Sequence, residues 1–189
     1  MAQRLVWLCT GIMLLLLTGI MLFSGGIRRK SVTEDTAVTR KAPEADSTVY
    51  LESLADIEPG TVLDAGEVDL SQASKYFTVS KIEDNIFQQI DGKSYVENNN
   101  IQREDLRYLK LLHYNYDHQL QVGELIVNKK IAKDCKKVFR ELFAEEYEIA
   151  SMYLIDRFWT GDSVDSDTNS IEHNNTSAFN YRVVPDTDR

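Results

Sequence analysis

The chain has 189 residues, with 21 basic and 30 acidic side chains and a net charge of −9 at pH 7. This length allows one domain and an additional segment. All four basic residues of positions 1–30 precede the acidic part, so residues 31–189 have 17 basic and 30 acidic residues and a net charge of −13. Because such a surface repels phosphate backbones, the composition argues against a nucleic-acid-binding protein.

Residues 5–23 (LVWLCTGIMLLLLTGIMLF) form an uninterrupted apolar segment with no charge. As a helix these residues span about 28 Å, close to the hydrocarbon thickness of about 30 Å in a bilayer. The apolar region of a secretory signal is usually only about 7–15 residues long, although the small residues at 24–26 permit cleavage. We therefore expect residues 1–30 to be a single-pass membrane anchor or a long signal segment.

Residues 31–67 are rich in Ser, Thr, Asp, Glu and Ala, contain Pro43 and Pro59, and show weak periodicity. This composition predicts a flexible stalk, in which residues 49–57 are the segment able to form one or two helical turns. Order is expected to begin near residue 68. The two cysteines, Cys9 in the apolar segment and Cys135 on a predicted helix, have no spacing typical of a metal site.

Helical spacing marks the first part of the predicted domain. Asp69 and Ser71 offer a cap, and apolar residues recur at 82, 86, 87 and 90. Asp91-Gly92 is expected to end this helix, since glycine tolerates the left-handed turn of a helix terminus. The polar residues 93–103 are expected to form a loop.

The clearest unit is a hairpin followed by a helix. Residues 106–114 (LRYLKLLHY) and 120–128 (LQVGELIVN) have the composition of strands, and five polar residues connect them. Within 129–146, apolar residues at 131, 132, 135, 138, 139, 142 and 143 form one helical stripe.

Two further strands are predicted over residues 152–158 and 177–184. The residues between them, 160–170, are polar and are expected to form a loop in which Asp162, Asp165 and Asp167 are solvated. The order of elements predicts an α+β domain in which a helix packs on a mainly antiparallel sheet.

Several of these segments resemble one family of bacterial enzymes. They are residues 86–87, 92–95, 106–109, 111–114, 122–128 and 154–156, and the closing segment 174–182 (NNTSAFNYR), which is the most specific. In this order they resemble the D-alanyl-D-alanine carboxypeptidase-like family of cell-wall zinc metallopeptidases, over residues 70–182. The resemblance implies the peptide stem of peptidoglycan as a partner. It also favours attachment to the cell membrane with the C-terminal part outside the cytoplasm, against the basic residues at 28–30, which by the positive-inside rule favour the cytoplasm.

The family resemblance implies a zinc-bound water as the nucleophile and a carboxylate as the general base. The zinc ligands of the family come from a segment of the form S-x-H-x-x-G-x-A-x-D and a later histidine, and residues 1–189 contain no such segment. We therefore expect residues 68–189 to be the N-terminal part of a peptidase-like domain, truncated before the zinc ligands and inactive alone. Two alternatives stay open: a non-catalytic, membrane-anchored module that binds wall peptide or protein, and an enzyme completed by a separate chain.

Arg182 matches the family's arginine that binds the carbonyl oxygen or carboxylate of the substrate, and Tyr181 precedes it as in the family motif. A guanidinium is permanently charged and its planar donors suit an oxyanion. From the residues alone, a solvated surface charge is the alternative interpretation. His113, His118 and His173 lack a compact ligand spacing, so no catalytic or metal-binding residue is assigned to this chain.

Overall fold

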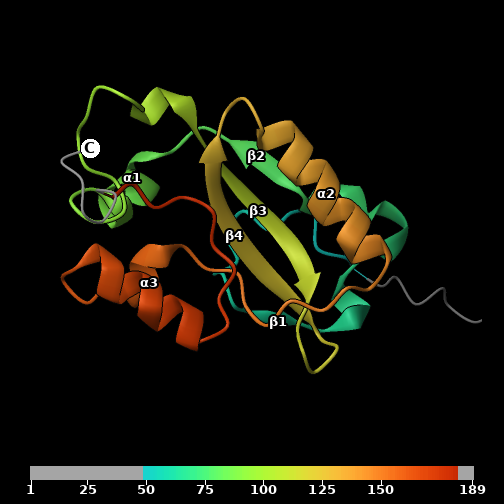
Figure 1. Cartoon of the computed structure of the whole chain (residues 1–189). Coiled ribbons are helices and arrows are strands. Elements are labelled where there is room, and N and C mark those ends of the chain that lie inside the picture. The colour runs from blue at the N-terminus through green and yellow to red at the C-terminus, as the bar shows by residue number, and fades with distance from the viewer. Residues whose placement is uncertain (1–48, 183–189) are drawn as a thin grey trace, which may run out of the picture. The chain divides into compact units, whose positions relative to one another are not determined.

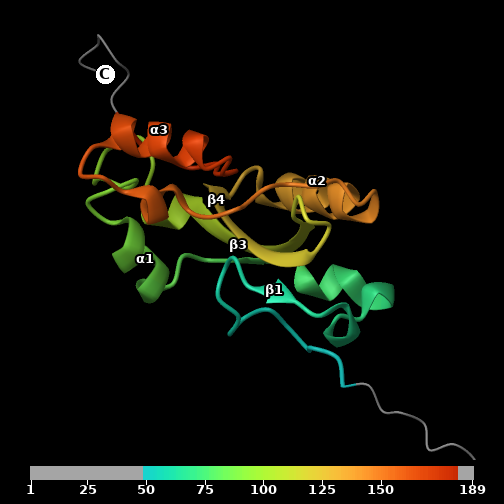
Figure 2. The same ribbon diagram turned by 90° about the horizontal axis from the view of Figure 1, so that it is seen from below.

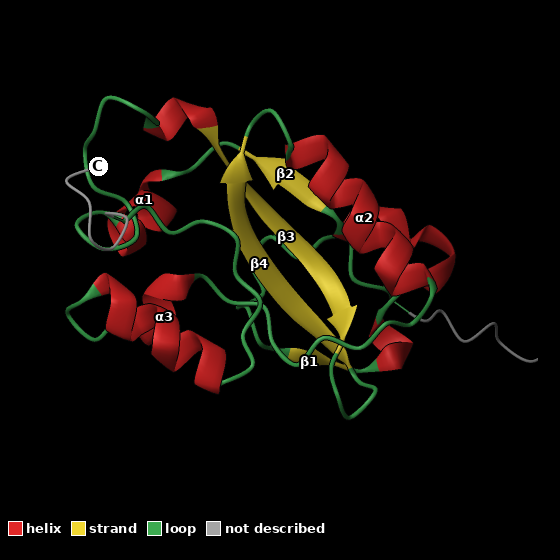
Figure 3. Cartoon of the chain, viewed as in Figure 1, coloured by secondary structure: helices red, strands yellow, loops and turns green. Residues whose placement is uncertain are grey.

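The structure, a computed structural model, describes residues 49–182 (Figure 1). Its strands are β1 (Val62–Leu63), β2 (Thr78–Ser80), β3 (Leu106–Tyr114) and β4 (Leu120–Asn128). Its α-helices are α1 (Asp84–Ile90), α2 (Ala132–Ala144) and α3 (Ser163–Glu172), and short 3₁₀ helices span Ala65–Glu67, Leu70–Tyr76, Arg103–Asp105 and Ile155–Phe158 (Figure 3). The predicted anchor or signal segment lies outside the described residues. Within residues 49–182 no helix is long and apolar enough to span a bilayer.

The four strands form one antiparallel sheet in the order β1-β4-β3-β2. β3 and β4 have the bounds that the hydropathy pattern predicts, and their nine-residue register aligns Leu106 with Asn128 and Tyr114 with Leu120. The predicted α+β class with an antiparallel sheet is confirmed. In this register Lys110 lies directly opposite Glu124.

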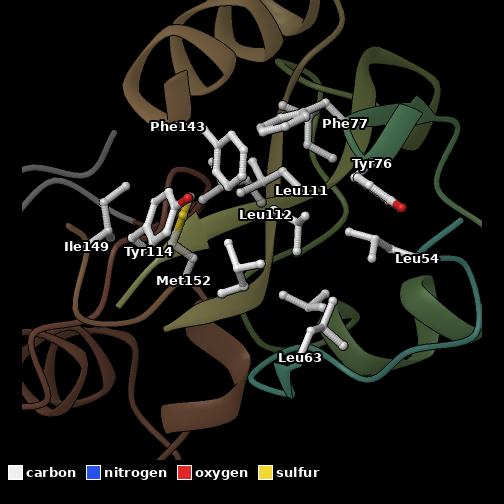
Figure 4. Packing of buried hydrophobic residues seen from close by; sticks show 14 of the residues in the cluster. Leu54, Leu63, Tyr76, Phe77, Leu111, Leu112, Tyr114, Phe143, Ile149 and Met152 are labelled. Atoms are coloured by element: carbon white, nitrogen blue, oxygen red, sulfur yellow. The ribbon is translucent and has the colours of Figure 1, made fainter. Parts of the chain in front are cut away.

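The sheet separates two layers of helices. α2 covers one face, whereas α1 and the 3₁₀ helix Leu70–Tyr76 lie on the other side (Figure 2). The apolar stripe predicted for α2 is confirmed, because Cys135, Phe139 and Leu142 pack against the main core cluster. Phe143 stacks on Tyr114 with a centroid distance of 5.1 Å (Figure 4). Burial of each such large side chain contributes roughly 1.5–3 kcal/mol to folding.

Residues 49–67 are part of the folded domain, so order begins before the predicted boundary near residue 68. Leu54 is fully buried, and the hydroxyl of Tyr76 donates to the carbonyl oxygen of Leu51 at 2.8 Å. β1 pairs with β4, and the Gly60 amide donates to the carbonyl oxygen of Val122 at 2.7 Å. These contacts join residues far apart in the chain, and local periodicity does not reveal them.

The helix predicted near residues 82–90 is confirmed as α1, and Gly92 adopts the expected positive φ of 71°. The cap at Asp69 is also confirmed, with its carboxylate accepting from the Ser71 amide at 3.0 Å. This cap begins a separate 3₁₀ helix that ends at Tyr76, after which β2 pairs with β3.

The predicted strand over residues 152–158 is wrong. The Met152 carbonyl oxygen accepts from the Glu124 amide at 3.0 Å, beside the edge of β4. The Leu154 amide then donates to the carboxylate of Glu124 rather than to a strand partner, at 3.3 Å. A 3₁₀ helix, Ile155–Phe158, follows. The carboxylate of Glu124 thus takes the place of the backbone acceptor that a further strand would use on β4.

The predicted loop over residues 160–170 is a helix, α3. Asp162 caps it, with its carboxylate accepting from the amides of Val164 and Asp165 at 2.8 and 3.1 Å. The buried side chains of α3 are Ser166 and Ser170, so the helix has no apolar stripe that the sequence pattern would reveal.

The predicted strand over 177–184 is also wrong for the described residues 177–182, which carry no strand. The backbone here bonds at separate points instead of along a ladder. Thr176 donates its amide to the Ser151 carbonyl oxygen at 2.9 Å, and Tyr181 donates to that of Ser94 at 2.8 Å.

Candidate functional site

The two residues predicted to bind substrate, Tyr181 and Arg182, lie at the end of the described chain and are docked on it. Arg182 forms an ion pair with Asp167 of α3 while 41% of its side chain stays exposed. The side-chain amide of Asn180 donates to the same Asp167 carboxylate at 2.7 Å. The Tyr181 hydroxyl accepts from the Asn100 side chain at 3.2 Å. Asp167, expected to be solvated, is therefore the residue that holds the closing segment.

A cleft of about 770 Å³ opens on the side of the sheet opposite α2. Four segments line it: residues 55–59, the stretch from β2 through α1 to Lys93, the facing residues of β3 and β4, and residues 154–157. Arg182 is not among the lining residues. The structure thus has a charged cleft that is separate from the predicted substrate residues.

Three charged side chains are buried in this cleft. Lys110 is 9% exposed, Glu124 6% and Asp156 9%, and they are all the Lys, Arg, Asp and Glu residues that are buried among residues 49–182. Burying a charge costs free energy unless it is paired and hydrogen-bonded. Their concentration in one cleft marks it as the candidate functional site.

Each of the three buried charges bonds a different segment. The Lys110 ammonium donates to the carbonyl oxygen of Ala55 at 2.8 Å. The Glu124 carboxylate accepts from the Tyr108 hydroxyl at 2.9 Å, in addition to the Leu154 amide. Asp156 accepts from the backbone amide and hydroxyl of Ser94, at 3.0 and 2.7 Å.

Burial sets the protonation behaviour of the cleft. It raises the pKa of Glu124, against the opposing effects of the Tyr108 hydrogen bond, the Leu154 amide and the charges of Lys110 and Arg157. Burial lowers the pKa of Lys110, against the attraction of Glu58, Glu124 and Asp56. Burial, followed by the charge of Glu124, raises the pKa of Tyr108 well above its ordinary value, so this phenol stays a hydrogen-bond donor.

The three histidines lie apart. His113 is buried in the core with Nδ1 3.2 Å from the Tyr114 carbonyl oxygen. His118 lies between Glu146 and Glu148 at 3.4 and 3.1 Å, and His173 Nδ1 lies 2.8 Å from the Asn169 carbonyl oxygen. Within residues 49–182 no group of three or more His, Cys, Asp or Glu side chains is arranged to hold a metal.

The two buried charges on the hairpin, Lys110 and Glu124, were not among the residues predicted from the sequence to be functional, although Glu124 lies in the segment 122–128 that carries the family resemblance. A signal for them exists in the sequence. Glu124 is the one ionisable residue of LQVGELIVN, and Lys110 is flanked by leucines on both sides in LRYLKLLHY. Counting outwards from the five-residue turn also places them opposite one another.

No family model matches the chain, and neither does any curated protein or solved structure with which it was compared.

Proposed function

We propose that this chain is a membrane-tethered cell-wall protein whose described residues form the substrate side of a D-alanyl-D-alanine carboxypeptidase-like domain. Arg182 binds the carboxylate or carbonyl oxygen of a peptidoglycan peptide stem. Tyr181 holds the backbone next to Arg182 in place through its own amide. Among residues 49–182 no group of side chains is arranged to hold zinc, and we assign peptide binding rather than hydrolysis to these residues.

The observation that carries this proposal is the fixed position of the closing segment. The Asp167 carboxylate accepts a hydrogen bond from the Asn180 side chain and forms an ion pair with Arg182. The Tyr181 backbone amide donates to the carbonyl oxygen of Ser94. A guanidinium has five N–H donors, and the pair with Asp167 occupies only one side of it. The exposed remainder of Arg182 has the donors that a planar carboxylate requires.

A second contact network supports the same assignment. Ser94, whose carbonyl oxygen accepts from Tyr181, is itself held by the buried Asp156. The Asn175 side chain bonds the amide and carbonyl of Tyr153, at 2.8 and 3.1 Å. The closing motif is thus bonded near its start to Tyr153, after α2, and near its end to Ser94, before β3.

The test is a binding titration of the full chain in detergent micelles. The ligand is a stem pentapeptide that ends in D-alanyl-D-alanine and is acetylated on its α-amino group and lysine side chain. We expect saturable binding, and Arg182→Lys should weaken it roughly tenfold because a lysine cannot make the bidentate contact. Arg140→Lys, an exposed arginine on α2, is the matched control.

Two outcomes would contradict the proposal. Binding that Arg182→Lys leaves unchanged would remove the substrate role of this residue. Release of free D-alanine from the same pentapeptide by the purified chain with zinc would show that the chain carries its own catalytic machinery.

A further inference from the structure

The cleft has a second feature that the proposed function does not use: its central charges are opposed but not paired. Lys110 and Glu124 are register partners on β3 and β4 and face the same side of the sheet. Side chains in such directly opposed positions have Cβ atoms about 5 Å apart. Within the described chain, however, the two form no ion pair: Lys110 bonds Ala55 and Glu124 bonds Tyr108 and Leu154.

Both groups retain hydrogen-bonding capacity. A lysine ammonium has three donors and a carboxylate has about four acceptor positions. Lys110 uses one donor and Glu124 accepts two hydrogen bonds within residues 49–182. Asp156 likewise accepts two hydrogen bonds, one on each oxygen, and both come from Ser94. The cleft therefore offers free donors on Lys110 and free acceptor positions on Glu124, and these two residues lie on directly opposed strand positions.

The rest of the lining also carries charges of both signs, three basic and three acidic side chains besides the buried ones: Lys81, Lys93, Arg157, Asp56, Glu58 and Glu83. Asp56 and Glu58 lie close enough to Lys110 to attract its charge, so a simple anion would meet repulsion there. Arg157, stacked on the Tyr153 ring at 4.1 Å from its centroid, attracts the carboxylate of Glu124. A simple cation would thus meet Arg157 and Lys110 at the same place.

We propose that this cleft binds small molecules that carry a free α-amino-acid centre, with the ligand's carboxylate on Lys110 and its ammonium on Glu124. An α-amino acid places these two groups on one carbon, which suits two charges on directly opposed strand positions. The volume of about 770 Å³ also holds the ligand's side chain, and Ile86 and Leu154 give part of the lining an apolar character. Cavities of roughly 300–1,000 Å³ are typical of small-molecule sites. This inference is independent of the role of Arg182.

The ligand side of the test uses neutral-side-chain probes and the isotope-labelled full chain in detergent micelles. We expect free L- or D-glutamine, or L- or D-leucine, to shift the amide resonances of β3 and β4 in a saturable manner. The N-acetyl and carboxamide derivatives each lack one charge and should bind at least about tenfold more weakly, since each loses a charge-assisted contact. If none of the free amino acids shifts these resonances, or if the blocked derivatives bind as tightly, the proposal is wrong.

The protein side uses variants matched by substitution type. Lys110→Met and Glu124→Gln remove one charge each and should weaken the bound amino acid by roughly tenfold. Lys133→Met and Glu145→Gln make the same changes at exposed positions at and beyond α2 and should not alter binding. Unchanged affinity in both cleft variants would overturn the proposal. If a cleft variant fails to fold, the comparison of free and blocked probes still decides.

The two proposals fail separately. The acetylated pentapeptide used for Arg182 has no free α-amino-acid centre, and Arg182→Lys should leave glutamine or leucine binding unchanged because Arg182 does not line the cleft. A loss of amino-acid binding in Arg182→Lys equal to that in Lys110→Met would show that the cleft is not an independent site.

Discussion

Lys110 and Glu124 stand opposite one another on β3 and β4, yet each bonds to a segment outside the hairpin. The Lys110 ammonium holds residues 55–59 by a hydrogen bond to the Ala55 carbonyl oxygen. The Glu124 carboxylate holds the segment after α2 by accepting from the Leu154 amide. The hairpin therefore carries, near its middle, polar contacts to two of the four segments that line the cleft. This arrangement ties the shape of the candidate site to the stability of the fold.

Removing the acceptor at Glu124 should destabilise the domain. In Glu124→Leu the hydroxyl of Tyr108 and the amide of Leu154 lose their partner in a buried place, and Lys110 loses one of the opposing charges that act on it. We expect the free energy of unfolding to fall by about 2–4 kcal/mol. Glu124→Gln keeps an acceptor and should cost only about 1 kcal/mol. Denaturant unfolding of the full chain in micelles measures both, and equal costs for the two variants would contradict this account.

Asp156 and Ser94 should act as a coupled pair. Both Asp156 oxygens accept from Ser94, and the Ser94 carbonyl in turn accepts from the Tyr181 amide. We expect Asp156→Ala to cost about 2–3 kcal/mol and Ser94→Ala about 1 kcal/mol. In a double-mutant cycle the two costs should fall short of additivity by at least about 0.5 kcal/mol, as for residues in one network. Additive costs would mean that Ser94 is held by other contacts.

Buried His113 should make the domain less stable in mild acid. Burial lowers the pKa of this imidazole, and its Nε2 has no partner among the described atoms. The unfolded side chain, with a pKa of about 6.5, binds a proton at a pH where the folded side chain stays neutral. The unfolded state thus binds more protons, so the free energy of unfolding decreases as the pH falls below about 6.5.

The measurement for His113 is the free energy of unfolding between pH 5 and pH 7 in the parent and in His113→Leu. The contribution of His113 to the slope is at most about 1.4 kcal/mol per pH unit. The raised pKa of Glu124 acts in the opposite direction, because its contribution is present at low pH and is lost as the pH rises through the folded pKa. The difference between the two curves isolates His113. Identical slopes in parent and variant would refute the prediction.

The parts of the fold that follow a local period were predictable. β3, β4 and α2 show the expected apolar patterns, and Gly92 ends α1 at a turn that favours glycine. Elements built from side-chain contacts were not predictable. α3 is a polar helix whose start is fixed by the Asp162 cap. The segment at Met152 leaves the sheet because the Glu124 carboxylate accepts from the Leu154 amide.

The candidate site shows the same division. Arg182 was found through a sequence motif, but its partner Asp167 lies on a helix that the pattern did not predict. The cleft needs four segments to meet, and one of them, residues 55–59, has the composition of a flexible stalk. Tertiary packing rather than local propensity orders that segment, so only the opposed charges at Lys110 and Glu124 were open to inference from the hairpin register.

Gly123 should be required for the close approach of Met152 to β4. A Cβ atom at position 123 would lie 2.8 Å from the Cβ of Met152, 3.1 Å from His113 Cδ2 and 3.3 Å from Leu111 Cδ1. The Met152 Cβ cannot rotate away, because the Met152 carbonyl is held by the Glu124 amide. Gly123→Ala should therefore displace this segment and lower the free energy of unfolding by about 1–3 kcal/mol, the usual cost of overpacking.

Gly66→Ala is the matched control for Gly123→Ala. A Cβ atom at position 66 would meet only the Asp64 carboxylate, at 3.2 Å, and this side chain is exposed enough to move. We expect Gly66→Ala to change the free energy of unfolding by less than about 0.5 kcal/mol, as for most surface substitutions. Because Met152 and Leu154 are fastened to the same residue, Gly123→Ala should also shift the amide resonance of Leu154, whereas Gly66→Ala should not. Equal stability of the two variants would contradict this prediction. It would show that the segment after α2 can move away from β4 without a loss in the free energy of unfolding, and that the contacts of Glu124 do not hold it in place.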